Sequence, residues 1–191
     1  ALVTAVINAV NPKDFLPLMV DYQDRNGAYG TIPGSYFKRE GRAGERETLI
    51  SRTIDRPIRP MFPKHFRNEI QVIATVMSFD KDHETDVLAL CGASAALHIS
   101  KAPLAQPIAG VRICKVGDEY KLNPNFEDRE ASVIDLVVAG TADAITMVEG
   151  ESHEVSETEM LELVRFAHDH IRSIIDLQES MIAELGEIEK W

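Results

Sequence analysis

The sequence predicts an α+β domain in which a mixed sheet packs against helices and a long C-terminal amphipathic helix closes the fold. Three observations support this class: strand-like apolar runs in the first half, a long run of small apolar residues in the middle, and helical spacing at the end. With 191 residues and 45% hydrophobic content, the chain can bury a full core, so we expect one domain.

The predicted strands are short apolar segments bounded by turn residues. Ile70–Met77 is almost continuously apolar, which is typical of a strand buried on at least one side. Gly117 and Asp118 mark a hairpin between two later strands. The remaining strands are expected at Leu2–Ile7, Phe15–Tyr22, Ile108–Val116, Glu119–Leu122, Val133–Gly140 and Ala144–Glu149.

A first helix is expected from Glu45, because apolar residues recur at helical spacing up to Ile54. Pro57 disfavours helical geometry at Arg56, so this helix should end near Arg56. The segment Arg56–Pro60 then reads as an extended, stiff stretch between two prolines.

Two further helices are expected. Thr85–Ser100 is apolar and rich in small residues, which suits a helix packed closely on a sheet. Its Gly92-Ala93-Ser94 does not complete a Gly-x-Ser-x-Gly nucleophile motif, so a core role is favoured over a catalytic one. The last helix opens with a capping box at Ser156–Glu159 and continues to Leu185, with room for one break.

Charge is distributed unevenly along the chain. Residues 38–67 hold nine Lys or Arg against four acids, within a protein of formal net charge −11. Residues 151–191 instead hold eleven acids against three bases, so a nucleic acid should not touch that end. The basic segment predicts a local site for an anion on an acid-rich body.

A glycine-rich stretch precedes this basic segment. Five of the eleven glycines fall between Gly27 and Gly44, which predicts a loop. Within it, the aromatic pair Tyr36 and Phe37 is followed directly by Lys38 and Arg39, an arrangement that can stack bases and hold phosphates. A phosphorylated small ligand and a merely solvated basic face remain alternatives, as does burial of one ring against the other.

Three arginines follow, two on the first predicted helix and one in the extended segment after it. Arg52 and Arg56 share one face, where they can pair with Asp55 or Glu47. Arg59 is expected to be less committed to such internal pairs. It is therefore the better candidate for contact with an anion.

Other classes of site are disfavoured. Cys91 and Cys114 match no metal-ligand spacing and imply no disulfide framework, which suits a reducing cytoplasm. His168 and His170 face different directions on a helix, so they predict no metal site. No apolar run has the length needed to span a bilayer.

The order and spacing of these motifs resemble the first RNase PH-type core of the bacterial polynucleotide phosphorylase family. The resemblance runs over nearly the whole chain, and the Arg-Pro-Ile-Arg-Pro stretch is its most specific part. The matching segments are residues 30–42, 48–63, 71–76, 92–97 and 135–141.

The resemblance implies an activity and an assembly. That family degrades RNA from the 3′ end by phosphorolysis, with inorganic phosphate and Mg²⁺, releases nucleoside diphosphates, and can run backwards as a template-free polymerase. Its members are homotrimeric rings whose chains carry two RNase PH-type cores, a helical segment, and KH and S1 modules. RNA-degradosome partners are a further expectation.

The resemblance also assigns residues by position. Tyr36 and Phe37 correspond to the aromatic pair of the RNA channel, and Lys38 and Arg39 to the phosphate-binding pair that follows. The family usually has Phe-Phe-Arg-Arg there, and Tyr and Lys keep the ring and the charge. The predicted RNA-binding residues are thus Tyr36, Phe37, Lys38, Arg39, Arg42, Arg56 and Arg59.

No catalytic or metal-binding residue is predicted in this chain. The phosphate-binding segment of active cores is shortened here to Thr85–Leu90, and Asn123 and Arg129 stand where two aspartates are expected. Glu127 and Asp128 lie between them and would restore some acidity under another register. Mg²⁺ and phosphate should therefore bind outside this chain.

The resemblance sets the expected boundaries. Residues 1–185 form the first core, which lacks its opening strands, and residues 186–191 begin a linker. An autonomous exoribonuclease and a purely architectural ring subunit, in which Tyr36 and Phe37 would be buried at an interface, remain the alternatives.

Overall fold

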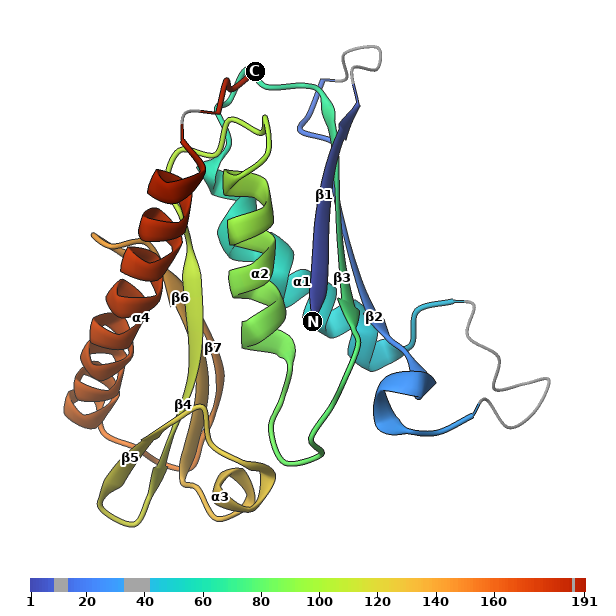
Figure 1. Cartoon of the computed structure of the whole chain (residues 1–191). Coiled ribbons are helices and arrows are strands. Elements are labelled where there is room, and N and C mark those ends of the chain that lie inside the picture. The colour runs from blue at the N-terminus through green and yellow to red at the C-terminus, as the bar shows by residue number, and fades with distance from the viewer. Residues whose placement is uncertain (9–13, 33–41, 187) are drawn as a thin grey trace.

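The computed structural model describes residues 1–8, 14–32, 42–186 and 188–191. These residues form four layers: a first sheet, the helices α1 and α2, a second sheet, and the helix α4 (Figure 1). The α+β class is confirmed, with the strands divided between two sheets of which only the first is mixed.

The first sheet has three strands, β1 (Leu2–Asn8), β2 (Leu18–Asp24) and β3 (Glu69–Val76). The central strand β3 pairs antiparallel with β1 and parallel with β2. Every second residue of β3 is buried, since one face of the sheet packs against α1 and α2. β2 begins and ends later than the sequence predicted.

Helix α1 (Glu45–Ile58) runs through Pro57 and continues into the short 3₁₀ helix η3 (Arg59–Met61). The predicted end near Arg56 and the extended Arg56–Pro60 segment were therefore wrong. A proline inside a helix costs about 3 kcal/mol. Ile54 and Ile58 are fully buried here, and burial of each such side chain contributes about 1.5–3 kcal/mol. Core packing thus outweighs the local preference.

Helix α2 (Asp86–His98) lies between the two sheets and contacts both. It approaches β4 so closely that a Cβ on Gly110 would lie 2.5 Å from Leu90 Cδ2. Ser94 is fully buried, accepts a hydrogen bond from Ile108 N at 2.8 Å and donates one to Gln178 Oε1 at 2.9 Å. The core role predicted for Gly92-Ala93-Ser94 is confirmed.

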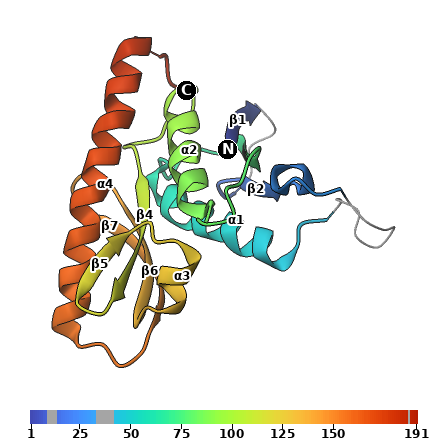
Figure 2. The ribbon, with the colours of Figure 1, turned by 60° about the horizontal axis from the view of Figure 1, so that its bottom comes forward.

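The second sheet is antiparallel, with strand order β5-β4-β6-β7. Every residue of β6 is buried, because α1 and α2 cover one face of the sheet and α4 covers the other (Figure 2). Its strands are β4 (Ala109–Val116), β5 (Glu119–Leu122), β6 (Ile134–Gly140) and β7 (Ile145–Ser152).

Helix α4 (Glu157–Leu185) is continuous, without the break that the sequence allowed. The predicted capping box is confirmed: Ser156 Oγ accepts from Glu159 N at 3.3 Å, and Ser156 N donates to Glu159 Oε2 at 3.3 Å. The sequence did not predict helix α3 (Phe126–Glu130) or the 3₁₀ helix η1 (Asn26–Tyr29).

The start of α4 generates a prediction about acid stability. Lys115 Nζ donates to Glu159 Oε1 at 2.6 Å, and this bond, followed by those with Ser156, lowers the pKa of Glu159 to about 2. A lowered pKa means that Glu159 stabilises the fold above its unfolded-state value of about 4.3 and that this contribution is lost as the pH falls toward about 2. Glu159→Gln should therefore lower the melting temperature at pH 6 and have little effect at pH 2.

The matched control is Glu157→Gln, which removes another carboxylate from the first turn of α4. At pH 6 its melting temperature should stay closer to that of the parent chain than the melting temperature of Glu159→Gln does, because the bond from Lys115 is made to Glu159. Equal pH profiles for Glu159→Gln and the parent would contradict the role of Glu159.

Candidate RNA interface and the charge network before helix α2

The predicted RNA-binding residues divide into two groups. Tyr36, Phe37, Lys38 and Arg39 lie outside the described residues. Arg42 is exposed just before α1, and among the described residues it forms no ion pair. Arg56 and Arg59 lie on α1 and at its end.

Arg59 donates more hydrogen bonds within the protein than Arg56 does. Its Nε and Nη2 donate to the two oxygens of Asp55 at 2.9 and 2.7 Å. Its Nη1 and Nη2 also donate to the backbone oxygens of Leu16 and Leu18 at 3.2 and 3.1 Å. The expectation that Arg59 is less committed to internal pairs was wrong, because the fork of its guanidinium fits Asp55 one helical turn away.

Arg56 and Arg52 are less engaged in ion pairs within the protein than the sequence suggested. Arg56 pairs with Glu149 of β7 at 3.1 Å rather than with Asp55 or Glu47, and both partners are about half exposed. Such exposed pairs contribute about 0–1 kcal/mol, so a ligand phosphate could compete for Arg56. Arg52 is exposed and has no ion pair with another described residue.

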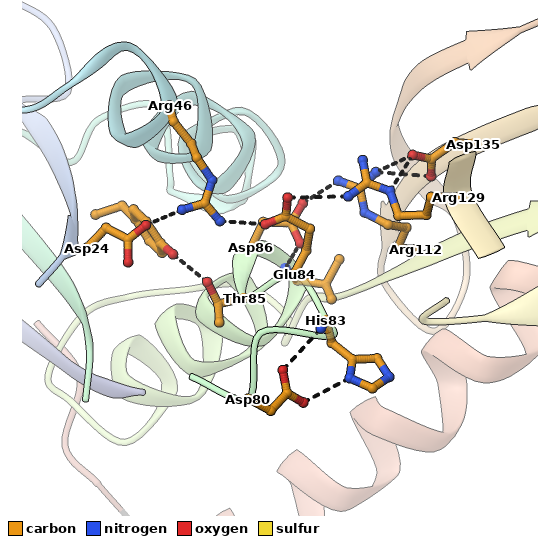
Figure 3. A network of polar contacts seen from close by, with 12 residues as sticks. Asp24, Arg46, Asp80, His83, Glu84, Thr85, Asp86, Arg112, Arg129 and Asp135 are labelled. Atoms are coloured by element: carbon orange, nitrogen blue, oxygen red, sulfur yellow. Dashed lines mark hydrogen bonds and ion pairs between the residues drawn. The ribbon is translucent and has the colours of Figure 1, made fainter. Parts of the chain in front are cut away.

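Seven charged side chains form a continuous network around the start of α2 (Figure 3). We call this set the charge network. It links α1 and the end of β2 to α3 and the second sheet, and therefore crosses between the two halves of the chain. Its members are Asp24, Arg46, Glu84, Asp86, Arg112, Arg129 and Asp135.

Arg112 of β4 is the most deeply buried cation of the network. Its Nη2 donates to Asp86 Oδ2 at 2.6 Å, and its Nη1 donates to Asp135 at 2.8 and 3.0 Å. Burial alone would lower the pKa of Arg112, but the charges of Asp86 and Asp135 raise it above its ordinary value. Its Nε is buried without a partner among the described residues.

Asp86 occupies the first turn of α2. Its Oδ1 accepts from Val87 N at 2.8 Å, while its Oδ2 accepts from Arg112. A backbone N–H at a helix N-terminus and a guanidinium are the groups that would bind a phosphate. In this chain the Asp86 carboxylate already accepts hydrogen bonds from both kinds of group.

Glu84 connects the two sides of the network. It accepts from Arg46 Nη2 at 2.6 Å and from Arg129 Nη1 at 3.3 Å. Arg46 also donates to Asp24, and Arg129 Nε donates to Asp135 at 2.8 Å. Hence every arginine of the network is paired with at least two acceptors.

The charged residues of this region are already paired with one another, which disfavours a bound phosphate or Mg²⁺. The charge network has four carboxylates and three guanidinium groups, a formal charge of −1, so it would repel an anion. Asn123 accepts from Arg112 N at 3.0 Å, and Asp128 pairs with Lys121 at 2.5 Å. No group of three or more potential metal ligands occurs within the described ranges.

A cavity of about 560 Å³ opens between α1 and the charge network. Its wall combines polar residues of the network with apolar residues of α1. The lining residues are Glu45, Arg46, Leu49, Ile50, Thr53, Glu84, Asp86 and Arg112.

The sequence did not predict most of the charge network. It singled out Arg129 and the Thr85–Leu90 segment, but not Asp24, Arg46 or Arg112. The only local signal was an arginine in the middle of an apolar strand, which indicates a buried cation and hence a buried carboxylate nearby.

The cysteines and histidines that the sequence analysis considered as site candidates lie within the described residues. Cys91 and Cys114 are both free. His168 Nε2 lies 3.1 Å from the oxygen of Thr141, and the ring of His170 packs on Phe166. None of the described helices combines the length and apolarity needed to cross a membrane.

Comparison with known proteins identifies the class to which this fold and site belong. Two family models match in succession: domain 1 of the 3′ exoribonuclease family over residues 1–103, and domain 2 of that family over residues 106–170. The chain therefore belongs to the 3′ exoribonuclease (RNase PH) family.

Within this family, similar curated proteins are polyribonucleotide nucleotidyltransferases, another name for polynucleotide phosphorylases. The protein of Persephonella marina is 54% identical over 91% of this chain, and that of Aquifex aeolicus is 48% identical over 97%. The protein of Sulfurihydrogenibium sp. is 47% identical over 97%. The chain spans about a quarter of the length of these relatives, 24–27%. The resemblance drawn from the sequence is confirmed.

The charge network generates a prediction about stability. Asp135→Asn would leave Arg112 and Arg129 without their shared counter-charge, and breaking a buried ion pair on one side costs about 3–5 kcal/mol. We expect a loss of about 3 kcal/mol in the free energy of unfolding, measured by urea denaturation.

The matched control is Asp169→Asn, because Asp169 pairs with Arg172 at 3.6 Å on the exposed surface of α4. It should change the free energy of unfolding by no more than about 0.5 kcal/mol. Equal losses for the two variants would show that the buried pairs do not stabilise the fold more than an exposed one.

Proposed function

We propose that this chain is the RNA-guiding, ring-forming first core of a 3′-to-5′ phosphorolytic exoribonuclease. The enzyme uses inorganic phosphate to release nucleoside diphosphates from RNA, and the reaction is reversible as template-free polymerisation. The observation that carries this proposal is the match of 91–97% of the chain to polyribonucleotide nucleotidyltransferases, together with a charge network that has no place for phosphate.

RNA contact is assigned to the segment that precedes α1 and to α1 itself. Tyr36 and Phe37 stack on bases, while Lys38, Arg39 and Arg42 neutralise backbone phosphates. Arg56 joins them, since its exposed pair with Glu149 is easily exchanged. Contact of RNA with Arg59 stays a prediction. The four hydrogen bonds that Arg59 donates within the chain disfavour such a contact.

The chemistry itself is assigned to residues outside this chain. Phosphorolysis requires an anion site for phosphate and ligands for Mg²⁺. In the charge network every carboxylate is already paired with an arginine, and the formal charge is −1. The reaction therefore belongs to a second RNase PH-type core of the same protein, where Mg²⁺ and phosphate bind.

The larger assembly is part of the same proposal. The complete protein is a homotrimeric ring with KH and S1 modules, acts in mRNA turnover in the cytoplasm, and is open to RNA-degradosome partners. In that assembly, residues 1–185 form the first core and residues 186–191 begin the linker to the helical segment.

The first test measures phosphate-dependent release of nucleoside diphosphates from a single-stranded RNA in the presence of Mg²⁺. The full-length protein should release them, and the 191-residue chain alone should not. Release by this chain alone would make it an autonomous exoribonuclease. No release by either protein would refute the proposed activity.

The second test concerns the cations of the RNA segment. In the full-length protein, Lys38→Ala combined with Arg39→Ala should weaken RNA binding and lower the slope of log Kd against log salt by about 0.7 for each lost phosphate contact. The control combines Lys101→Ala with Arg165→Ala, which removes the same two charge types from other exposed positions. An unchanged slope in the first variant would favour the architectural alternative.

A further inference from the structure

The segment proposed to bind RNA is flanked on both sides by described residues that contact Asp24. Before the segment, β2 ends at Asp24 and the chain passes through η1 to Ile32. After it, the described residues continue from Arg42 into α1. Both ends make side-chain contacts with Asp24.

The first contact holds the end that precedes the segment. Tyr29, the last residue of η1, donates from its hydroxyl to Asp24 Oδ2 at 2.6 Å. Its ring packs against Phe79, with the ring centroids 4.6 Å apart. Burial, followed by the hydrogen bond to Asp24, raises the pKa of Tyr29, so the phenol stays protonated and able to donate.

The second contact holds the end that follows the segment. Arg46, in the first turn of α1, donates from Nη1 to the same oxygen of Asp24 and to the hydroxyl of Tyr29, the latter at 3.1 Å. Glu47 accepts from Asp24 N at 2.8 Å and, with its other oxygen, from Gly44 N at 2.6 Å. The start of α1 is thus bonded to both the side chain and the backbone of Asp24.

These contacts are also fixed to the body of the protein. Arg46 donates from Nη2 to Glu84 at 2.6 Å, and Glu84 belongs to the charge network before α2 (Figure 3). The Asp24 side chain is only 12% exposed, so its bonds face little competition from water. The two ends therefore have fixed positions relative to each other and to α2.

We propose that Asp24, Tyr29, Arg46 and Glu47 form a clamp that joins the described residues on either side of residues 33–41, and that Tyr29 and Arg46 are positioning residues for RNA binding. The inference rests on the proposed function of that segment. Fixing both ends of a binding segment reduces the conformational entropy lost on binding, which raises affinity without adding a contact to the ligand.

The test compares two tyrosines that each donate one hydrogen bond to a carboxylate. Tyr29→Phe removes the bond to Asp24 and keeps the ring on Phe79. Tyr120→Phe removes the bond to Glu162 Oε2, 3.1 Å long, between β5 and α4. Binding of a fluorescent oligoadenylate to the full-length protein is measured by anisotropy over a series of salt concentrations.

Tyr29→Phe should raise Kd by about twofold to tenfold, the range given by the loss of one hydrogen bond. The slope of log Kd against log salt should stay unchanged, because no phosphate contact is lost. Tyr120→Phe should leave both quantities unchanged. Asp24→Asn, which keeps the shape of the side chain, should reproduce the effect of Tyr29→Phe.

Two results would overturn the clamp. An unchanged Kd in both Tyr29→Phe and Asp24→Asn would show that the ends need no fixing, and a reduced salt slope in Tyr29→Phe would make Tyr29 part of the RNA contact itself. The variant with Lys38→Ala and Arg39→Ala separates the two proposals. If its slope falls while Tyr29→Phe binds normally, the clamp fails and the proposed function stands; if its slope is unchanged, both fail.

Discussion

The structure depends on pairing charges that are buried between the helical layer and the second sheet. The side chains of Arg112, Asp86 and Asp135 are 14% exposed or less, and unpaired charges at such depth would cost several kcal/mol each. Their pairing joins β4 and β6 to the start of α2, while Glu84 and Arg46 extend it to α1. The same contacts that satisfy the buried charges therefore fix the relative positions of the two halves of the core.

The sequence predicted the elements well where the signal was local. The apolar run of β3, the turn at Gly117-Asp118 and the capping box at Ser156 each lie within a few residues, and each was confirmed. It failed at Pro57, where burial of Ile54 and Ile58 against distant elements overrides the local geometry of proline. It also missed α3, whose five residues are too few for a helical period to show.

The site was less predictable than the fold, because its pairs are distant in sequence. Asp24 meets Arg46 across 22 positions, and Arg112 meets Asp86 across 26. No spacing rule selects such partners, since any of the 31 acidic residues could pair with a given arginine. The contacts of Arg59 were also mispredicted, although its partner Asp55 is only one turn away. The backbone oxygens that complete these contacts belong to Leu16 and Leu18, which lie 43 and 41 positions earlier in the chain.

The proposed function requires an acid-rich protein to present a local site for a polyanion. Residues 38–67 carry a charge of +5, and the remaining residues carry −16. At physiological salt the Debye length is about 8 Å, so an RNA phosphate bound at this segment, as proposed, would be screened from the acids that lie farther away. The acidic helix α4 lies on the opposite side of the second sheet from α1 (Figure 1). Because Arg46, Arg112 and Arg129 are already paired with carboxylates, the proposed attraction for RNA would rest on exposed cations such as Arg42 and Arg56.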